Sequence, residues 1–163
     1  MTFSLEDIHK TKTILGNGSY SSVVLGLGLL LSFILRDLNG SEVALKVFSS
    51  NDKTVMELAK NEASICNMIG KHPNVICYYG NYVENEGTPV IVMEKAEKPL
   101  VKLFREERLN RTRYTFLLSI IRSLTYTVLK NRALQVCRGL KYLHDLNISH
   151  GDISVGSGSV FHL

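Results

Sequence analysis

A glycine-rich turn followed by an apolar strand with a single lysine most limits what this chain can fold into. Residues 16–23 read GNGSYSSV, and residues 43–48 read VALKVF. Because glycine has no Cβ atom, such a turn can adopt positive φ and bring backbone amides close to a phosphate. Lys46 shares one strand face with Ala44, so its ammonium group needs an anionic partner on an otherwise apolar wall. The pattern predicts a phosphate cradle, and the alternative is an ordinary hairpin turn.

Residues 51–69 have the strongest helix pattern in the chain. Thr54 and Glu57 have the spacing of a capping box, and Gly70 supplies a C-terminal stop. The apolar face predicted by helical spacing contains Val55, Leu58, Ala59, Glu62, Ile65, Cys66 and Ile69. Glu57 falls on a different face and is the weaker candidate for an inward acid.

The acid on the apolar face of this helix is a candidate partner for the strand lysine. An inward carboxylate opposite an inward ammonium group suggests an ion pair between Glu62 and Lys46. The alternative is a Glu62 side chain that bends outward to solvent.

Composition and charge exclude several classes of protein. The chain has 163 residues, 45% of them hydrophobic, which suits a single domain with one core. The net charge is only +4 and the basic residues are scattered, which argues against a nucleic-acid partner. Three cysteines without CxxC spacing support neither a disulfide framework nor a zinc site, so we expect a reducing, cytoplasmic setting. The N-terminus lacks the pattern of a secretory signal.

Two apolar stretches, residues 23–35 and 114–129, raise the alternative of a membrane-associated regulator. The first is shorter than the roughly 18 residues that a spanning helix needs, and Arg122 interrupts the second. We therefore expect no membrane insertion.

At the glycine turn and the lysine strand, the chain resembles the eukaryotic protein kinases. The kinase glycine loop, GxGxxGxV, matches at Gly16, Gly18 and Val23, with Ser21 at the third glycine position. The kinase VAIK strand matches as residues 43–46. The resemblance implies an α+β fold, with an antiparallel β-sheet N-lobe, one regulatory helix and an incomplete helical C-lobe.

The same resemblance implies a domain organisation. It makes residues 1–163 a partial protein kinase domain, with an N-lobe (1–94), a hinge (95–98), an incomplete C-lobe (99–163) and two insertions (26–36 and 111–130). The second insertion would end where a kinase-like helix resumes, at residues 131–145.

The resemblance also implies an ATP site between the glycine loop, Lys46 and the hinge. Val23 and Ala44 would form the roof over the base, and Met93 would guard the back of the pocket. Backbone groups of Glu94 and Ala96 would bond the adenine edge, so side-chain identity there carries little information. The implied nucleotide-binding residues are Gly16, Asn17, Gly18, Ser19, Val23, Ala44, Lys46, Met93, Glu94 and Ala96.

Residues 147–154, NISHGDIS, resemble the kinase catalytic loop HRDLxxxN. Asp152 would accept the proton of the attacking hydroxyl, with His150 packed beneath it as a scaffold. A buried His-x-Asp in a generic turn is the alternative. Ser157 stands where the family places a metal-holding asparagine, and no Asp-Phe-Gly follows. The family implies Mg²⁺, but we expect no metal ligands among these residues.

Two functions from different classes remain open. The first is a serine/threonine protein kinase in which Lys46, Glu62 and Asp152 carry catalysis on a protein substrate. The second is a truncated or pseudokinase-like module that binds nucleotide or a partner without turnover. The insertions and the terminal residues also suggest an imperfect gene model.

Overall fold

The computed structural model describes residues 8–28, 42–49, 52–84, 87–96 and 118–149. These residues divide between two compact units. The sheet unit lies within residues 1–71 and 77–95, and the helical unit lies within residues 72–76 and 96–163.

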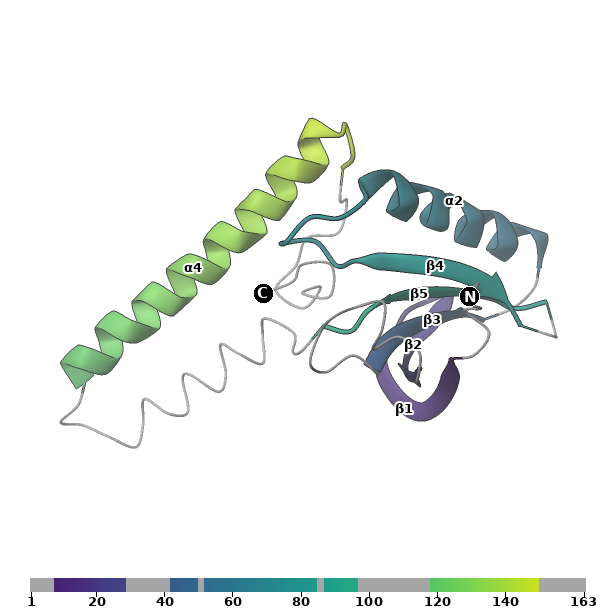
Figure 1. Cartoon of the computed structure of the whole chain (residues 1–163), viewed down its shortest axis with the longest axis horizontal. Coiled ribbons are helices and arrows are strands. Elements are labelled where there is room, and N and C mark those ends of the chain that lie inside the picture. Colours follow the sequence, from purple (N-terminus) through teal and green to yellow (C-terminus); the bar gives the residue numbers. More distant parts are fainter. Residues whose placement is uncertain (1–7, 29–41, 50–51, 85–86, 97–117, 150–163) are drawn as a thin grey trace. The chain divides into compact units, whose positions relative to one another are not determined.

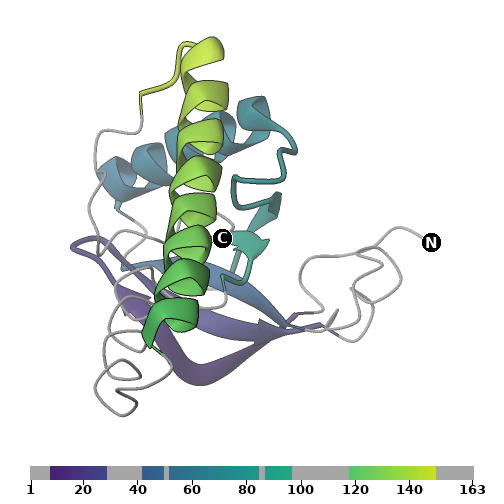
Figure 2. The same cartoon turned by 90° about the vertical axis from the view of Figure 1, so that its left-hand side faces the viewer.

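The sheet unit is a five-stranded antiparallel sheet with one helix against it (Figure 1). The spatial order of the strands is β1-β2-β3-β5-β4. Their bounds are β1 His9–Asn17, β2 Ser21–Leu27, β3 Glu42–Phe48, β4 Tyr78–Val83 and β5 Pro89–Glu94. Helix α2, Lys53–Ile69, contacts β4 and β5 and lies along one side of the sheet in both Figure 1 and Figure 2. The predicted antiparallel N-lobe sheet with one helix is confirmed.

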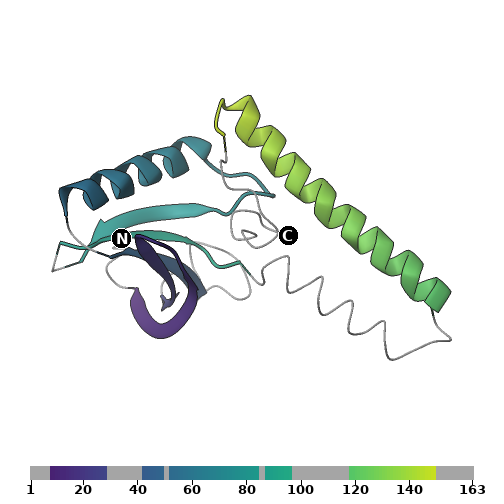
Figure 3. The same ribbon diagram turned by 180° about the vertical axis from the view of Figure 1, so that it is seen from behind.

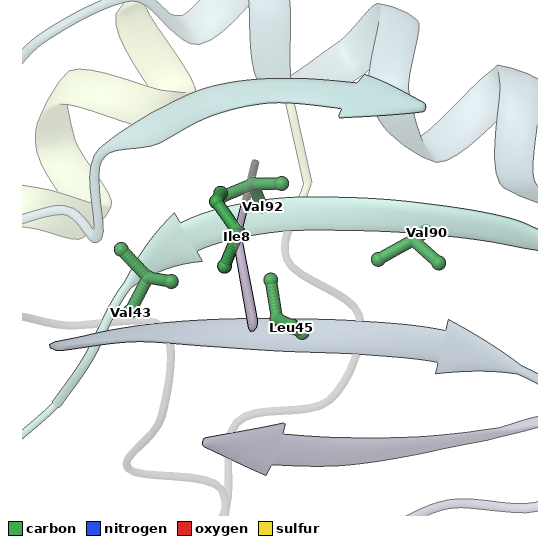
Figure 4. Packing of buried hydrophobic residues seen from close by; sticks show 5 residues of the cluster. All are labelled: Ile8, Val43, Leu45, Val90 and Val92. Carbon is green, nitrogen blue, oxygen red and sulfur yellow. The ribbon is translucent and has the colours of Figure 1, made fainter. Parts of the chain in front are cut away.

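The apolar residues of the two central strands alternate between the faces of the sheet, as the period of two in a strand requires. On one face, Ile8 joins valines and a leucine from β3 and β5 in a core that is almost closed to solvent (Figure 4). This first core consists of Ile8, Val43, Leu45, Val90 and Val92. On the other face, Phe48 and Ile91 pack with α2.

Helix α2 is buried along a narrower ridge than its sequence predicts. Its buried residues are Val55, Ala59 and Ala63, which are spaced four residues apart and so lie on one line along the helix. Leu58 and Ile65, which helical spacing puts on the apolar face, are each 43% exposed, so the buried line is narrower than that face. Small alanine side chains let the helix approach the sheet on that line, and residues to either side remain in contact with solvent.

The ends of α2 differ in how well they follow the predicted signals. The N-cap is Asp52, whose carbonyl accepts a hydrogen bond from the Met56 amide at 2.9 Å, and no side chain caps this end. The predicted capping box at Thr54 is therefore wrong, because the helix begins one residue before it. The predicted stop is confirmed: Gly70 is the C-cap and has a φ of 67°.

Strand β2 continues further than the sequence suggests. Gly26 pairs with Val43 and Leu27 pairs with Glu42, so the first two residues of the expected insertion (26–36) are part of β2. A Cβ atom on Gly26 would lie 2.8 Å from Leu45 Cδ1 and 2.9 Å from Val43 Cγ2. Close approach to β3 is thus the reason for a glycine inside this strand.

The helical unit contains α4, Leu118–Asp145, which is one unbroken helix of 28 residues (Figure 3). The helix continues through residue 131, where the second expected insertion would end, since no proline interrupts it and its one glycine is Gly139. Among the described helices, none is long and apolar enough to cross a membrane.

The segment between α2 and β4 belongs to the helical unit. His72 stacks on Tyr142 of α4, with ring centroids 4.4 Å apart and an angle of 14° between the rings. The Asn74 amide donates to His72 Nδ1 at 3.1 Å, and the Val75 amide donates to the His72 carbonyl at 3.1 Å. Asn74 is buried. These contacts fold the segment into a compact turn against the ring of Tyr142.

Candidate functional site

The strand lysine and the helix glutamate form the predicted ion pair. Lys46 Nζ lies 2.6 Å from both carboxylate oxygens of Glu62. Lys46 reaches this position from β3, where it shares a face with Phe48, whose ring centroid lies 5.5 Å from Nζ. The two side chains retain 25% and 35% of their exposure. The ammonium group is therefore fixed in direction while it remains open to a further anion.

The contribution of this pair to folding stability is modest, because both side chains remain partly solvated. Pairs of this kind contribute from about 0 to 1 kcal/mol. The structural effect is larger than the energetic one: the pair joins α2 to the centre of the sheet at a defined point. Any shift of α2 along its axis would separate the two charges.

The glycine turn is a tight hairpin between β1 and β2. The Gly18 amide donates to the Ser21 carbonyl at 2.8 Å, which closes a turn with Ser19 and Tyr20 at its tip. The Tyr20 carbonyl accepts from the Ser49 amide at 2.8 Å, which ties the tip to the end of β3. The hairpin and Lys46 therefore belong to one connected piece of sheet.

The glycines of this hairpin are used differently from the sequence-based expectation. Among the described glycines, positive φ occurs at Gly70, Gly80 and Gly87, and neither Gly16 nor Gly18 adopts it. The amide of Gly18 is occupied within the turn. A Cβ atom built on Gly16 would meet no heavy atom within 4 Å, so neither its φ angle nor a lack of space requires a glycine there. The approach to this part of the backbone is open.

Strand register places the predicted roof residues on the same face as the lysine. Val23 pairs with Lys46, and Ala44 pairs with Met93, and directly paired residues of an antiparallel sheet lie on one face. Leu25 pairs with Ala44 and joins this face, although the kinase motifs did not single it out. Its spacing of two from Val23 was the signal that could have found it.

The end of β5 is fastened to the residue that precedes β4. The Glu94 amide donates to the Cys77 carbonyl at 2.8 Å, and the Cys77 amide donates to Glu94 Oε2 at 3.0 Å. The Glu94 side chain therefore has a hydrogen-bonding role at this point, which the expectation of backbone contacts to adenine did not include. Ala96 belongs to the helical unit, and Asp152 lies outside the described residues.

A known protein family matches the chain across both units. The sequence model of the family described as protein tyrosine and serine/threonine kinase matches residues 9–156. The chain belongs to the protein kinase family. The match extends from the first residue of β1 past the end of α4.

Individual kinases are similar over nearly the whole chain. Fibroblast growth factor receptor 1 of Dugesia japonica is 30% identical over 154 residues, covering 93% of this chain and 17% of the relative. Serine/threonine-protein kinase PLK4 of Nematostella vectensis is 29% identical over 159 residues, covering 94% and 14% respectively. Mitogen-activated protein kinase kinase kinase 3 of Arabidopsis thaliana is 27% identical over 148 residues, covering 88% and 21%. The chain thus spans about a fifth or less of these relatives.

A half-buried thiol lies close to the ion pair of this kinase domain. Burial raises the pKa of Cys66, the negative charge of Glu62 raises this pKa further, and the positive charge of Lys46 lowers it. A raised pKa leaves less of the reactive thiolate near neutral pH. The reactivity of Cys66 therefore depends on the charges of both Glu62 and Lys46.

We expect the alkylation rate of Cys66 to change in opposite directions when either charge is removed. At about pH 8, below the ordinary thiol pKa, Glu62→Gln lowers the Cys66 pKa and speeds its reaction with iodoacetamide. Lys46→Met raises the same pKa and slows the reaction. Peptide mass spectrometry over time measures both rates, and exposed Cys137 is the internal reference. Equal rates in the three proteins would contradict this electrostatic coupling.

In the part of the chain that the structure describes, no three or more histidine, cysteine, aspartate or glutamate side chains are grouped so that they could hold a metal ion.

Proposed function

We propose that this kinase domain binds ATP on the α2-facing side of the sheet and transfers the γ-phosphoryl group to a serine or threonine of a protein. The observation that carries the proposal is the ion pair between Lys46 and Glu62, at 2.6 Å and only partly solvated. An ammonium group held in this way can bind phosphate oxygens without a further loss of side-chain freedom.

The base and the phosphates would use different parts of the sheet. Val23, Leu25, Ala44 and Met93 share the lysine face and offer an apolar surface to adenine. The backbone of Glu94 and of Ala96 would bond the edge of the base. Backbone amides at Gly16, Asn17, Gly18 and Ser19 would turn toward the phosphates, which requires the bond between Gly18 and Ser21 to open on binding.

Transfer itself needs a base outside the sheet unit. We assign this role to Asp152, whose carboxylate would accept the proton of the attacking hydroxyl. The hydroxyl oxygen bonds to the γ-phosphorus, the bond from that phosphorus to the β–γ bridging oxygen breaks, and ADP leaves. Lys46 would stabilise the charge on the phosphates during this step.

A second function is favoured by one observation. Ser157 stands at the position where kinases place a metal-holding asparagine. A domain with this change could hold nucleotide without turning it over. Its function would then be binding, with Lys46 and the glycine hairpin still in use.

Two measurements on the whole chain separate these functions. We expect ATP to raise the melting temperature of the protein and radiolabelled γ-phosphate to appear on a mixture of serine and threonine peptides supplied with magnesium. Asp152→Asn should retain the thermal shift and reduce transfer by about 100-fold or more. Stabilisation without transfer in the unmodified protein would support the binding function, and the absence of both would contradict the proposal.

A further inference from the structure

Two of the three places where the chain passes between the units lie beside each other. The chain leaves the sheet unit after Lys71, returns at Cys77 and leaves again after Lys95. Cys77 and Glu94 are hydrogen-bonded to each other by two bonds of 2.8 and 3.0 Å. The end of β5 is therefore held by the returning chain segment.

The second of these bonds is made by a side chain. Cys77 lies just before β4, and its amide donates to the Glu94 carboxylate at Oε2. A hydrogen bond from an amide to a carboxylate is stronger than one between neutral groups. The Glu94 amide in turn donates to the Cys77 carbonyl. Both the backbone and the side chain of Glu94 are therefore hydrogen-bonded to the backbone of Cys77.

On its opposite side, the end of β5 has a neighbouring strand and an exposed ion pair, and exposed pairs contribute little to stability. Glu94 pairs with Val43 of β3, and the neighbouring Lys95 Nζ lies 2.6 Å from Glu42 Oε2. Burial raises the pKa of the Cys77 thiol. The positive charge of Lys71 lowers this pKa, and the negative charge of Glu94 raises it. This thiol is therefore protonated near neutral pH and does not compete with Glu94 as an anion.

We propose that the Glu94 side chain is a positioning residue, which fixes the backbone at the end of β5 for the base of a purine nucleotide. This inference rests on the proposed function and extends it. A backbone fixed before binding does not have to be ordered by the ligand, so the base binds more tightly. Glu94 then determines how strongly the domain prefers ATP over a bare triphosphate.

The test compares two probes in four variants of the whole chain. Calorimetry gives the dissociation constants of ATP, which uses base and phosphates, and of inorganic tripolyphosphate, which uses phosphates alone. Glu94→Gln retains an acceptor at the same reach, whereas Glu94→Asp keeps the charge but is one methylene too short. Glu94→Ala removes the group. Glu42→Gln is the matched control, because it breaks the neighbouring ion pair and leaves Cys77 untouched.

We expect Glu94→Asp and Glu94→Ala to bind ATP about tenfold more weakly, the loss given by one hydrogen bond to a charged group. Their affinity for tripolyphosphate should remain unchanged. Glu42→Gln should resemble the unmodified protein with both probes. Glu94→Gln, which keeps a neutral acceptor, should bind ATP more weakly than the unmodified protein and more tightly than Glu94→Ala. Amide exchange measured by NMR should be fastest at Cys77 in the Asp and Ala variants. This second readout reports the bond itself, independently of nucleotide.

The outcomes are distinct. Equal ratios of ATP to tripolyphosphate affinity in all variants would overturn the positioning role while ATP binding itself stands. Unchanged exchange at Cys77 in Glu94→Asp and Glu94→Ala would also overturn it. If the unmodified protein binds neither probe, the proposed function fails and the inference fails with it.

Discussion

Replacing Lys46 by methionine is expected to abolish detectable ATP binding while the protein remains folded. Methionine has a similar length and keeps the contact with Phe48, but it cannot donate to a phosphate oxygen. Each hydrogen bond between charged partners contributes about 1.5–3 kcal/mol, so two such bonds to phosphate correspond to a loss of about 100-fold or more in affinity. Stability should change little, because both members of the ion pair are partly solvated.

The control for this prediction removes the same charge elsewhere. Lys141 pairs with Asp145 one turn further along α4, and their side chains are 75% and 60% exposed. Lys141→Met should leave both the ATP dissociation constant and the melting temperature unchanged. Calorimetry and thermal unfolding measure these quantities. If Lys46→Met binds ATP within about threefold of the unmodified affinity, Lys46 does not bind the phosphates as proposed.

The second large effect concerns stability. Gly26→Ala should lower the free energy of unfolding by about 1–3 kcal/mol, the usual effect of overpacking. The added methyl group would lie 2.8 Å from Leu45 and 2.9 Å from Val43. Both residues are fully buried and lie between β2 and β5, so neither can move aside without disturbing the core.

A matched glycine replacement separates this clash from a general effect of removing glycine. Gly16→Ala places its methyl group in open space, so we expect a change within about 0.5 kcal/mol. Denaturant unfolding monitored by circular dichroism measures both proteins. Equal stability of Gly26→Ala and Gly16→Ala would contradict the register of β2 against β3.

Local periodicity was enough to predict the ion pair. A period of two sets the face of Lys46, and a period near four sets the face of Glu62, so both orientations follow from short segments. The breadth of the buried face of α2 does not follow in this way. Leu58 and Ile65 lie within the predicted apolar arc, but the sheet covers only the line through Ala59.

The features that the sequence did not reveal depend on which strands are neighbours. The clash at Gly26 exists because β2 pairs with β3 in one register. The bond between Cys77 and Glu94 joins residues 17 positions apart, and it forms only because β4 lies beside β5. Helix caps depend on local sequence, but residue type alone allows both Thr54 and Asp52 as the N-cap. The helix begins at Lys53, so Asp52 is the N-cap.

The turn at residues 72–76 limits how the protein can be divided. A recombinant fragment that stops at the end of β5 would include His72 but not Tyr142, and would expose a ring face that is now covered. A fragment that starts after β5 would contain α4 but lack residues 72–76, which form the turn that packs against it. Neither half is a continuous stretch of polypeptide, so expressing the sheet by itself would require a short artificial bridge in place of five native residues.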